Sequence, residues 1–283
     1  MREPVESHAR VNGVNLCYFE WPGEGQPVFL AHATGFHARC WDQVVARLPG
    51  RRVIAIDMRG HGRSEKVAPP YKWMFFAEDV AALERHLNLQ RAVAVGHSKG
   101  GHAITVAAAR EPGIFAKLLL VDPVIMPRAA YGIQRDAGPH FAAKRRNNWA
   151  TVEEMIERFE GRSPYNLWDP LVLDDYCRYG LLPNPHGEGF VLACPPEIEA
   201  ATYTGSAGAD PYDDIARLNI PVRILRARER TENSPMDMTS SPITGELATH
   251  FANVEDVPLP QYTHFIPMEA PCLVAEHILS MLD

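Results

Sequence analysis

The sequence predicts an α/β fold in which a mostly parallel central sheet carries helices on both faces. Two observations lead to this fold class: short β-rich runs alternate with longer helical runs, and four of the short runs are too continuously apolar for a sheet with one solvated face. In such folds, ligands bind beyond the carboxyl ends of the strands. The four runs are residues 27–31, 52–57, 92–96 and 118–122.

A hairpin and two helices complete the first half of the chain. The dipeptide Asn12-Gly13 suits the positive φ angles of a tight turn, so residues on either side of it, 7–11 and 14–19, are predicted to pair. Residues 75–87 place apolar and charged side chains on opposite helical faces, and residues 100–110 form an alanine-rich helical run. Each helical run follows a predicted strand, as the fold class requires.

The strand-helix rhythm stops after Asp122 for about 90 residues and then resumes. Strands are predicted at 221–225 and 254–259, and a last helix at about 271–282. The sequence therefore predicts a core domain formed by residues 1–122 and 218–283, with residues 123–217 inserted as a helical cap, or lid.

The insertion is rich in aromatic residues, with eleven among its 95 residues against fourteen in the other 188. These side chains either shape an apolar substrate pocket over the strand ends or pack the interior of the insertion itself. Candidates for the pocket are Trp149, Trp168, Tyr176 and Tyr179. Asp136, Arg145 and Lys99 are candidates for polar contacts in this pocket. The run from Lys144 to Arg146 is, however, more typical of a solvated helix face.

Composition excludes several classes of protein. Hydrophobic residues make up 46% and charged residues 22%, as in an ordinary soluble globular protein. The formal net charge of −7 has the wrong sign for a protein that neutralises phosphates, so no nucleic-acid partner is expected. No apolar run approaches the roughly 18 residues that span a bilayer, and the first twelve residues are polar, so we expect a cytoplasmic protein without membrane contact.

Neither the cysteines nor the histidines form a metal or redox motif. The five cysteines are scattered without a C-x-x-C pair, and the twelve histidines include no H-E-x-x-H, so reduced thiols and no metal are expected. The oligomeric state stays open, a homodimer being one option.

The strongest motif is Gly96-His97-Ser98-Lys99-Gly100, a G-x-S-x-G between a predicted strand and a predicted helix. Glycines flank such a sharp turn because a β-carbon there would clash, and the turn exposes the serine hydroxyl at the edge of the sheet. A serine nucleophile needs a histidine base, and in this arrangement the chain order is Ser, Asp or Glu, then His. His264 follows the last predicted strand and is the candidate base, whereas His277 falls within the last helix.

These residues resemble the α/β-hydrolase superfamily, specifically its capped, esterase-like members. The resemblance covers nearly the whole chain and includes, besides the G-x-S-x-G turn, AHATGF at 31–36, DMRGHGRS at 57–64 and HFIPMEAP at 264–271. It implies an oxyanion hole formed by the backbone N–H groups of Thr34 and Lys99, and a reaction without a metal or organic cofactor. It also implies that His32, Asp57 and His61 brace loops.

The acid of the triad is the point where the sequence departs from its relatives. Similar proteins commonly carry an aspartate in a G-x-x-D pattern after the strand that corresponds to 222–225, where this chain has Ala-Arg-Glu-Arg at 227–230. Some members place the acid one strand earlier, where this chain has Asp122. Asp122 is therefore the first candidate, Glu229 the second, and a loop acid such as Asp237 the third.

The predicted function is that of a serine hydrolase acting on small or medium apolar carboxylic esters through a Ser98–His264–Asp122 triad and an acyl-enzyme. Carbon–carbon bond hydrolysis, lactone hydrolysis and perhydrolysis use the same triad and stay open. A non-catalytic homologue that binds a ligand in the capped pocket is the alternative from another class.

Overall fold

A computed structural model describes residues 3–131, 140–232, 234 and 238–283. Its main feature is an eight-stranded sheet with the strand order β1-β2-β4-β3-β5-β6-β10-β11. The first two strands are antiparallel to their neighbours, and all pairs from β4 to β11 are parallel. The strands are β1 (Val5–Val11), β2 (Val14–Trp21), β3 (Glu24–Ala31), β4 (Arg51–Ile56), β5 (Ala92–His97), β6 (Phe115–Val121), β10 (Val222–Arg226) and β11 (Val254–Pro258).

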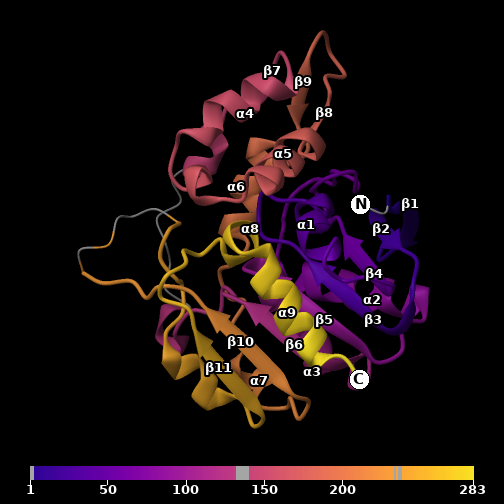
Figure 1. Ribbon diagram of the computed structural model, residues 1–283, viewed down its shortest axis with the longest axis vertical. Helices are drawn as coiled ribbons and strands as arrows, with labels where there is room; N and C mark the ends of the chain where they lie inside the picture. The colour runs from indigo at the N-terminus through magenta and orange to yellow at the C-terminus, as the bar shows by residue number, and fades with distance from the viewer. Residues whose placement is uncertain (1–2, 132–139, 233, 235–237) are drawn as a thin grey trace.

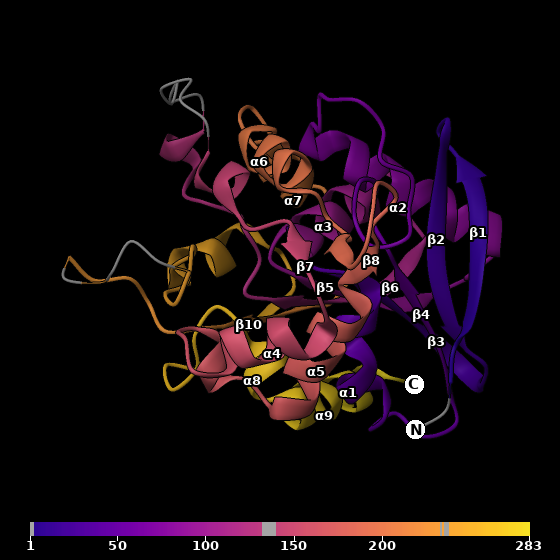
Figure 2. The ribbon, with the colours of Figure 1, turned by 90° about the horizontal axis from the view of Figure 1, so that it is seen from above.

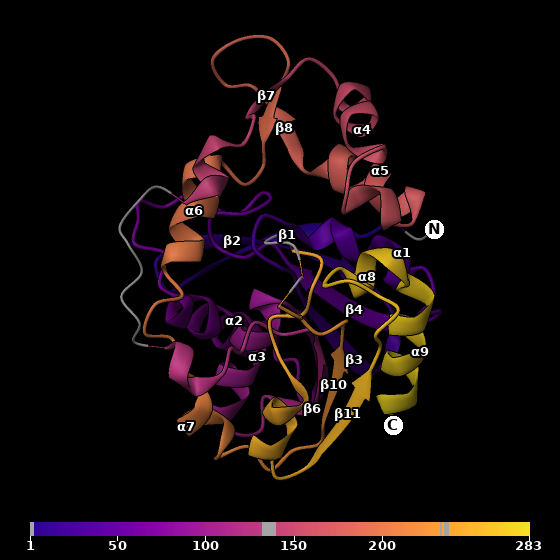
Figure 3. The same ribbon diagram turned by 90° about the vertical axis from the view of Figure 1, so that its left-hand side faces the viewer.

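Helices cover both faces of this sheet, which confirms the predicted fold class. One face packs on α2 (Trp73–Leu87), α3 (Lys99–Arg110) and α7 (Tyr212–Ile215), and the other packs on α1 (Asp42–Val45) and α9 (Pro271–Met281). Figures 2 and 3 show α2 and α3 on one side of the strands and α9 on the other. Every residue of β5 is buried, as expected for a strand that lies between two helical layers.

The opening hairpin forms where Asn12-Gly13 predicts it. Both residues have positive φ, 48° and 77°, and Val11 pairs with Val14 across the turn. Among the residues that the structure describes, no helix combines the length and apolar character needed to cross a membrane.

The insertion between β6 and β10 contains helices and, in addition, a small sheet that the sequence analysis did not predict. Besides α4 (Val152–Glu160), α5 (Pro170–Tyr179) and α6 (Pro196–Thr204), it holds an antiparallel sheet in the order β7-β9-β8. These strands, β7 (Asn148–Trp149), β8 (Leu181–Pro183) and β9 (Phe190–Leu192), are too short for a period-two pattern to show in the sequence. Figure 1 shows α4, α5 and the small sheet as a lobe above the carboxyl edge of the large one.

The end of the insertion belongs with the core layer. Helix α7 packs against α3, and its residues Tyr212 and Ile215 are part of the same hydrophobic cluster as the buried face of α2. The α4–α5 part has its own cluster, which includes Phe36 and Phe265 from core loops. The lobe is thus packed onto the loops that follow β3 and β11.

Glycines let α3 start close against the strand ends. A β-carbon at position 100 would lie 2.2 Å from the carbonyl oxygen of Ala31, the last residue of β3. A β-carbon at position 96 would lie 2.5 Å from the carbonyl group of Gly100. Real β-carbons are not found this close to backbone atoms, so larger residues at either position would push α3 away from the sheet.

Replacing Gly100 with alanine is therefore expected to lower the free energy of unfolding by about 3 kcal/mol, because backbone atoms on both sides prevent relaxation. Gly161, which follows α4 and has open space around its α-carbon, provides the matched control. Gly161→Ala is expected to change stability by less than about 0.5 kcal/mol. Urea denaturation of both variants checks this, and equal stability of the two would contradict the packing argument.

Candidate active site

Ser98 lies in the turn between β5 and α3. Its backbone angles, φ 56° and ψ −120°, fall where residues other than glycine are rare, and such strain costs about 1–3 kcal/mol. The backbone N–H of Ser98 donates to the carbonyl of Val121 at the end of β6, which ties the turn to the neighbouring strand. The strained turn therefore holds the hydroxyl at the carboxyl edge of the sheet, as the G-x-S-x-G motif predicts.

His264 connects Ser98 to a carboxylate. Its Nε2 lies 3.0 Å from Ser98 Oγ, and its Nδ1 lies 2.5 Å from Asp122 Oδ2. A carboxylate accepts hydrogen bonds, so Nδ1 carries the proton and Nε2 is free to accept the serine proton. All three side chains are buried, with 4%, 2% and 0% exposure for Ser98, His264 and Asp122. Three residues far apart in the sequence thus form one hydrogen-bonded chain.

Asp122 is held by donors on both of its oxygens. Oδ1 accepts from the backbone N–H of Ala227 at 2.9 Å and from Ser241 Oγ at 2.6 Å, while Oδ2 accepts from His264. Burying a carboxylate is costly unless hydrogen bonds replace water, and three donors do so here. Sequence reasoning missed Ser241, because an isolated serine in a long loop carries no detectable signal.

Glu229, the second acid candidate, does not reach His264. Glu229 points outward, with 52% of its side chain exposed, and forms an ion pair with Arg226. Arg226 is also paired with Asp256 at 2.9 Å, so its charge belongs to a network on the strand ends β10 and β11. Asp237 lies outside the described residues. The structure therefore brings Asp122, and not Glu229, together with the histidine.

The loop after β3 begins beside Gly100 at the start of α3 and is fixed by a neutral histidine. His32 Nδ1 donates to the carbonyl of Ala33 at 2.7 Å, and Nε2 accepts from the backbone N–H of Met58 at 3.0 Å. Burial, aided by the charge of Lys99, holds the pKa of His32 well below its usual value, in agreement with these neutral-ring contacts. This arrangement positions the segment that contains Thr34.

Asp57 and His61 also have bracing contacts. The carboxylate of Asp57 accepts from the backbone N–H groups of Ala38 and Arg63, at 2.6 and 2.7 Å. His61 Nδ1 donates to the carbonyl of Arg59 at 2.9 Å. Both side chains therefore hold loops around the strand ends, as the resemblance implied.

Lys99 is the first residue of α3, so its backbone N–H has no partner within the helix. This amide and the backbone N–H of Thr34 are the two predicted oxyanion donors. The helix N-terminus adds partial positive charge in the same direction, which favours negative charge developing beside Ser98.

A small cavity of about 10 Å³ lies between the loop after β3 and the inserted lobe. It is lined by Gly35, Phe36, Arg145, Met155, Tyr176 and Cys194, among others. Of the four aromatic candidates, Tyr176 lines this cavity and Trp168 packs on Phe36 and Phe265 next to it. Trp149 packs on Phe159 inside the lobe, and the ring of Tyr179 lies under Arg39, so these two serve packing.

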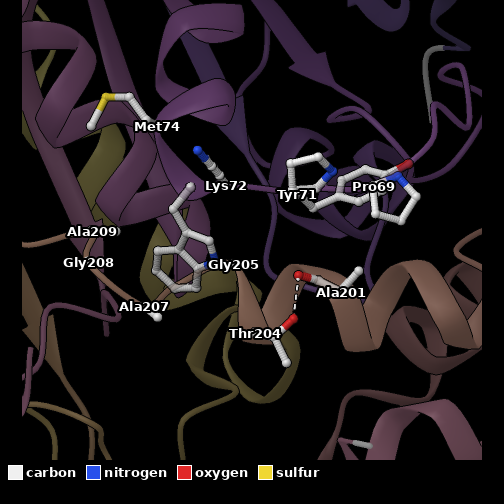
Figure 4. A pocket seen from close by; sticks show the side chains of 12 residues that line it. Pro69, Tyr71, Lys72, Met74, Ala201, Thr204, Gly205, Ala207, Gly208 and Ala209 are labelled. Atoms are coloured by element: carbon white, nitrogen blue, oxygen red, sulfur yellow. Dashed lines mark hydrogen bonds between the residues drawn. The ribbon is translucent and has the colours of Figure 1, made fainter. Parts of the chain in front are cut away.

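A larger, more open pocket of about 550 Å³ lies where α2 begins beside the end of α6 (Figure 4). Its walls include Tyr71, Lys72, Thr204 and Gly208. None of the residues that line it is a nucleophile paired with a base, and none belongs to the Ser98–His264–Asp122 chain. We therefore place the candidate active site at Ser98 and not in the larger pocket.

Arg145 turns inward, although the basic run around it is typical of a solvated face. Its guanidinium forms an ion pair with the buried Glu199 and donates to Tyr176 Oη at 2.9 Å. Lys144 is exposed and Arg146 stacks on Trp149, so only the middle residue of the run reaches the cavity. Asp136, the other polar candidate from the insertion, lies outside the described residues.

The side chain of Lys99 is buried without a charged partner. The residue is 1% exposed, and Nζ lies 3.9 Å from the ring centroid of Phe76 with no hydrogen-bond partner among the described residues. Burial lowers the pKa of Lys99 to about 7, and Asp79, whose charge opposes this change, is held by Arg59 through two hydrogen bonds of 2.6 Å. The sequence analysis offers Lys99 as a polar contact of the substrate pocket, but Lys99 is not among the residues that line the cavity beside Gly35.

All five cysteines are free thiols, four of them buried. In the part of the chain that the structure describes, the one group of side chains close enough to share a metal ion is Glu6, His8 and Cys17, on the opening hairpin. Glu6 is paired there with Arg63 at 3.3 Å. This group shares no residue with the Ser98 site.

The fold and the hydrogen-bonded chain define a class of protein: α/β folds that carry serine, histidine and aspartate at the carboxyl edge of a parallel sheet. Residues 28–277 match the profile described as the alpha/beta hydrolase family, so the chain belongs to the α/β-hydrolase family.

Curated relatives match over part of their length. A non-heme chloroperoxidase of Streptomyces lividans is 44% identical over 117 residues, which cover 40% of this chain and 42% of that protein. A bifunctional esterase/perhydrolase of Acinetobacter calcoaceticus is 38% identical over 117 residues, with the same two coverages. The matched segment thus spans less than half of either relative.

Solved structures match over nearly the whole chain. An E-2-(acetamidomethylene)succinate hydrolase superposes with a TM-score of 0.77 and 21% identity, covering 98% of both chains. An enol-lactonase of Burkholderia xenovorans LB400 superposes with a TM-score of 0.69 and 22% identity, covering 97% of this chain and 98% of that one. At these identities the likeness shows the shared fold alone.

Replacing Lys99 with methionine is expected to raise the free energy of unfolding at pH 7 by about 3 kcal/mol, because an unpaired buried amine is removed while its packing volume is kept. The pKa of Lys99 falls from 10.5 in the unfolded chain to about 7 in the folded one. Between these values the unfolded state binds more protons, so wild-type stability rises with pH and the advantage of the variant shrinks toward pH 10.

Urea denaturation of both proteins at pH 7, 8.5 and 10 measures this difference. Lys144→Met, at an exposed position, is the control and is expected to leave stability within about 0.5 kcal/mol at each pH. A Lys99→Met variant less stable than the wild type at pH 7 would contradict the unpaired state of the amine.

Proposed function

We propose that this protein is a serine hydrolase that cleaves carboxylic esters through an acyl-enzyme. The observation that carries the proposal is the continuous hydrogen-bonded chain from Ser98 Oγ through His264 to Asp122. Membership of the α/β-hydrolase family supports hydrolytic chemistry of this kind. Ser98 is the proposed nucleophile, His264 the base and Asp122 the acid, with Thr34 and Lys99 N–H groups as the oxyanion hole.

This arrangement supports the following proposed steps. His264 Nε2 takes the proton of Ser98 as Oγ attacks the ester carbonyl, and the carbonyl oxygen becomes an oxyanion beside the two amides. Asp122 stabilises the imidazolium and keeps its tautomer. The imidazolium then protonates the leaving alcohol. His264 next takes a proton from a water molecule that attacks the acyl carbonyl, and returns this proton to Ser98 Oγ as the acid leaves. Each oxyanion donor of this type contributes about 3 kcal/mol to transition-state stabilisation.

Residues 123–217 are proposed to act as a cap over this site, since Arg145, Tyr176 and Cys194 from the insertion line the cavity beside Gly35. The packing of Trp168 and Tyr176 around Phe36 keeps the cavity walls largely apolar.

Perhydrolysis is the second candidate function, and the relatives named chloroperoxidase and esterase/perhydrolase favour it. The same acyl-enzyme would be resolved by hydrogen peroxide in place of water, giving a peracid. Acid production and peracid production from one ester, measured with and without peroxide, separate the two outcomes.

Activity on a chain-length series of para-nitrophenyl esters tests the proposal. Ser98→Ala and Asp122→Asn are each expected to lower kcat by about 10⁴-fold, since the first removes the nucleophile and the second favours the wrong histidine tautomer. Glu229→Gln is the matched control for the acid, because Glu229 points to solvent, and is expected to retain wild-type activity. Loss of activity in Glu229→Gln with retention in Asp122→Asn would contradict the assignment.

A further inference from the structure

His97, the residue before the proposed nucleophile, has no role in the steps described above. It is the last residue of β5 and is fully buried. Its Nε2 lies 2.8 Å from the backbone carbonyl oxygen of His264. Since a carbonyl oxygen only accepts hydrogen bonds, Nε2 carries the proton and donates it to this bond. The side chain next to Ser98 is therefore bonded to the main chain of the candidate base.

The ring of His97 stays neutral beside His264. Burial lowers the pKa of His97 to about 3, and the charge of His264 acts in the same direction. The two rings lie 5.1 Å apart between centroids. A neutral ring with its proton on Nε2 keeps the bond to the carbonyl, and it places no second positive charge beside the imidazolium that forms on His264 in the proposed reaction.

The end of β5 provides a fixed point of attachment for this bond. His97 pairs with Val121 of β6, and the N–H of Ser98 donates to the carbonyl of the same valine at 3.1 Å. The ring of His97 also packs edge-on against Phe36, with 6.0 Å between centroids. Asp122 follows Val121 directly. The proposed nucleophile, the proposed acid and His97 therefore share the ends of two paired strands.

The candidate base, His264, lies instead in the loop after β11. Neighbouring backbone groups of this loop form hydrogen bonds with Arg228 and Glu269, which belong to neither β5 nor β6. The bond from Nδ1 to Asp122 fixes the ring of His264, and the bond from His97 fixes the main chain that carries the ring. Two anchors on the paired strands therefore determine where Nε2 of the base lies.

We propose that His97 is a positioning residue, which holds the main chain of His264 so that its Nε2 stays 3.0 Å from Ser98 Oγ. This rests on the proposed function, because the position of His264 matters for the reaction rate only if Ser98 is the nucleophile. Without the bond, the buried carbonyl of His264 loses this donor, and the loop shifts to find another. A shift of about 1 Å between reacting groups costs about 100-fold in rate.

His102 provides a matched control for this bond. It is also buried, and its Nε2 donates to a backbone carbonyl, that of Ala209, at the same distance of 2.8 Å. Burial lowers the pKa of His102 to about 4, and in both histidines Nδ1 has no partner among the described residues. The bond of His102 leads from α3 to the segment before α7, and not to His264. One substitution made at both positions therefore removes the same kind of bond, with a consequence for the base at His97 alone.

The test measures kcat for para-nitrophenyl acetate and the urea midpoint of variants at both positions. His97→Leu is expected to lower kcat by about 10- to 100-fold and His102→Leu by less than about threefold, with similar losses in urea midpoint. His97→Gln is expected to recover most of the activity, because its amide nitrogen lies as many bonds from the β-carbon as Nε2 does. The amide nitrogen in His97→Asn lies one bond closer, so this variant is expected to stay as slow as His97→Leu.

A second measurement needs no turnover. The rate at which the Nδ1 proton of His264 exchanges with water, followed by NMR, reports how firmly the ring is held against Asp122. His97→Leu is expected to speed this exchange by about tenfold or more, and His102→Leu to leave it unchanged.

Equal effects of the two leucine variants on kcat and on proton exchange would overturn the inference. Equal activity of His97→Gln and His97→Asn would also overturn it, and this comparison decides the matter if His97→Leu does not fold. A wild-type protein that fails to react with a fluorophosphonate at Ser98 would refute the proposed function instead, and the exchange comparison still shows whether His97 holds His264 in place.

Discussion

The backbone turn at Ser98 is the constraint on which the site depends. Its positive φ is tolerated because Gly96 and Gly100 let α3 start within contact of the ends of β3 and β5. The same close approach leaves the N–H of Lys99 free at the helix N-terminus and directs the lysine side chain into the interior. One local conformation thus places the Ser98 hydroxyl beside His264, leaves the Lys99 amide free of a helical partner and buries the Lys99 amine.

The parallel sheet explains why residues from distant parts of the chain meet at this turn. Strands β5, β6, β10 and β11 end at the same edge, and the loops after them carry Ser98, Asp122 and His264. The loop after β10 contributes the backbone N–H of Ala227 instead of an acid. The site therefore takes its carboxylate from the end of β6 and only a hydrogen-bond donor from the end of β10. The hydrogen-bonded chain from Ser98 through His264 to Asp122 is still complete.

The strands, the turn and the base follow from local chemistry and could be predicted: apolar continuity marks buried strands, and glycines mark a tight strand-to-helix turn. The sequence does not decide between Asp122 and Glu229 as the acid of the triad, because both follow strands that end at the same edge of the sheet. Only tertiary packing determines that Glu229 points outward and pairs with Arg226. The inward turn of Arg145, the hydroxyl of Ser241 and the short strands of the insertion depend on tertiary contacts that leave no periodic signal.

The central claim is that Ser98 carries the acyl group during turnover. The most direct measurement is acid quenching of the protein within milliseconds of mixing with excess para-nitrophenyl acetate, followed by mass spectrometry of its peptides. The account predicts one acetyl group on the peptide that contains Ser98, appearing with a burst of nitrophenol and absent from Ser98→Ala. Hydrolysis at the wild-type rate by Ser98→Ala, with no acetyl group on this peptide in the wild type, would contradict it, since the ester would then be cleaved without an acyl group on Ser98.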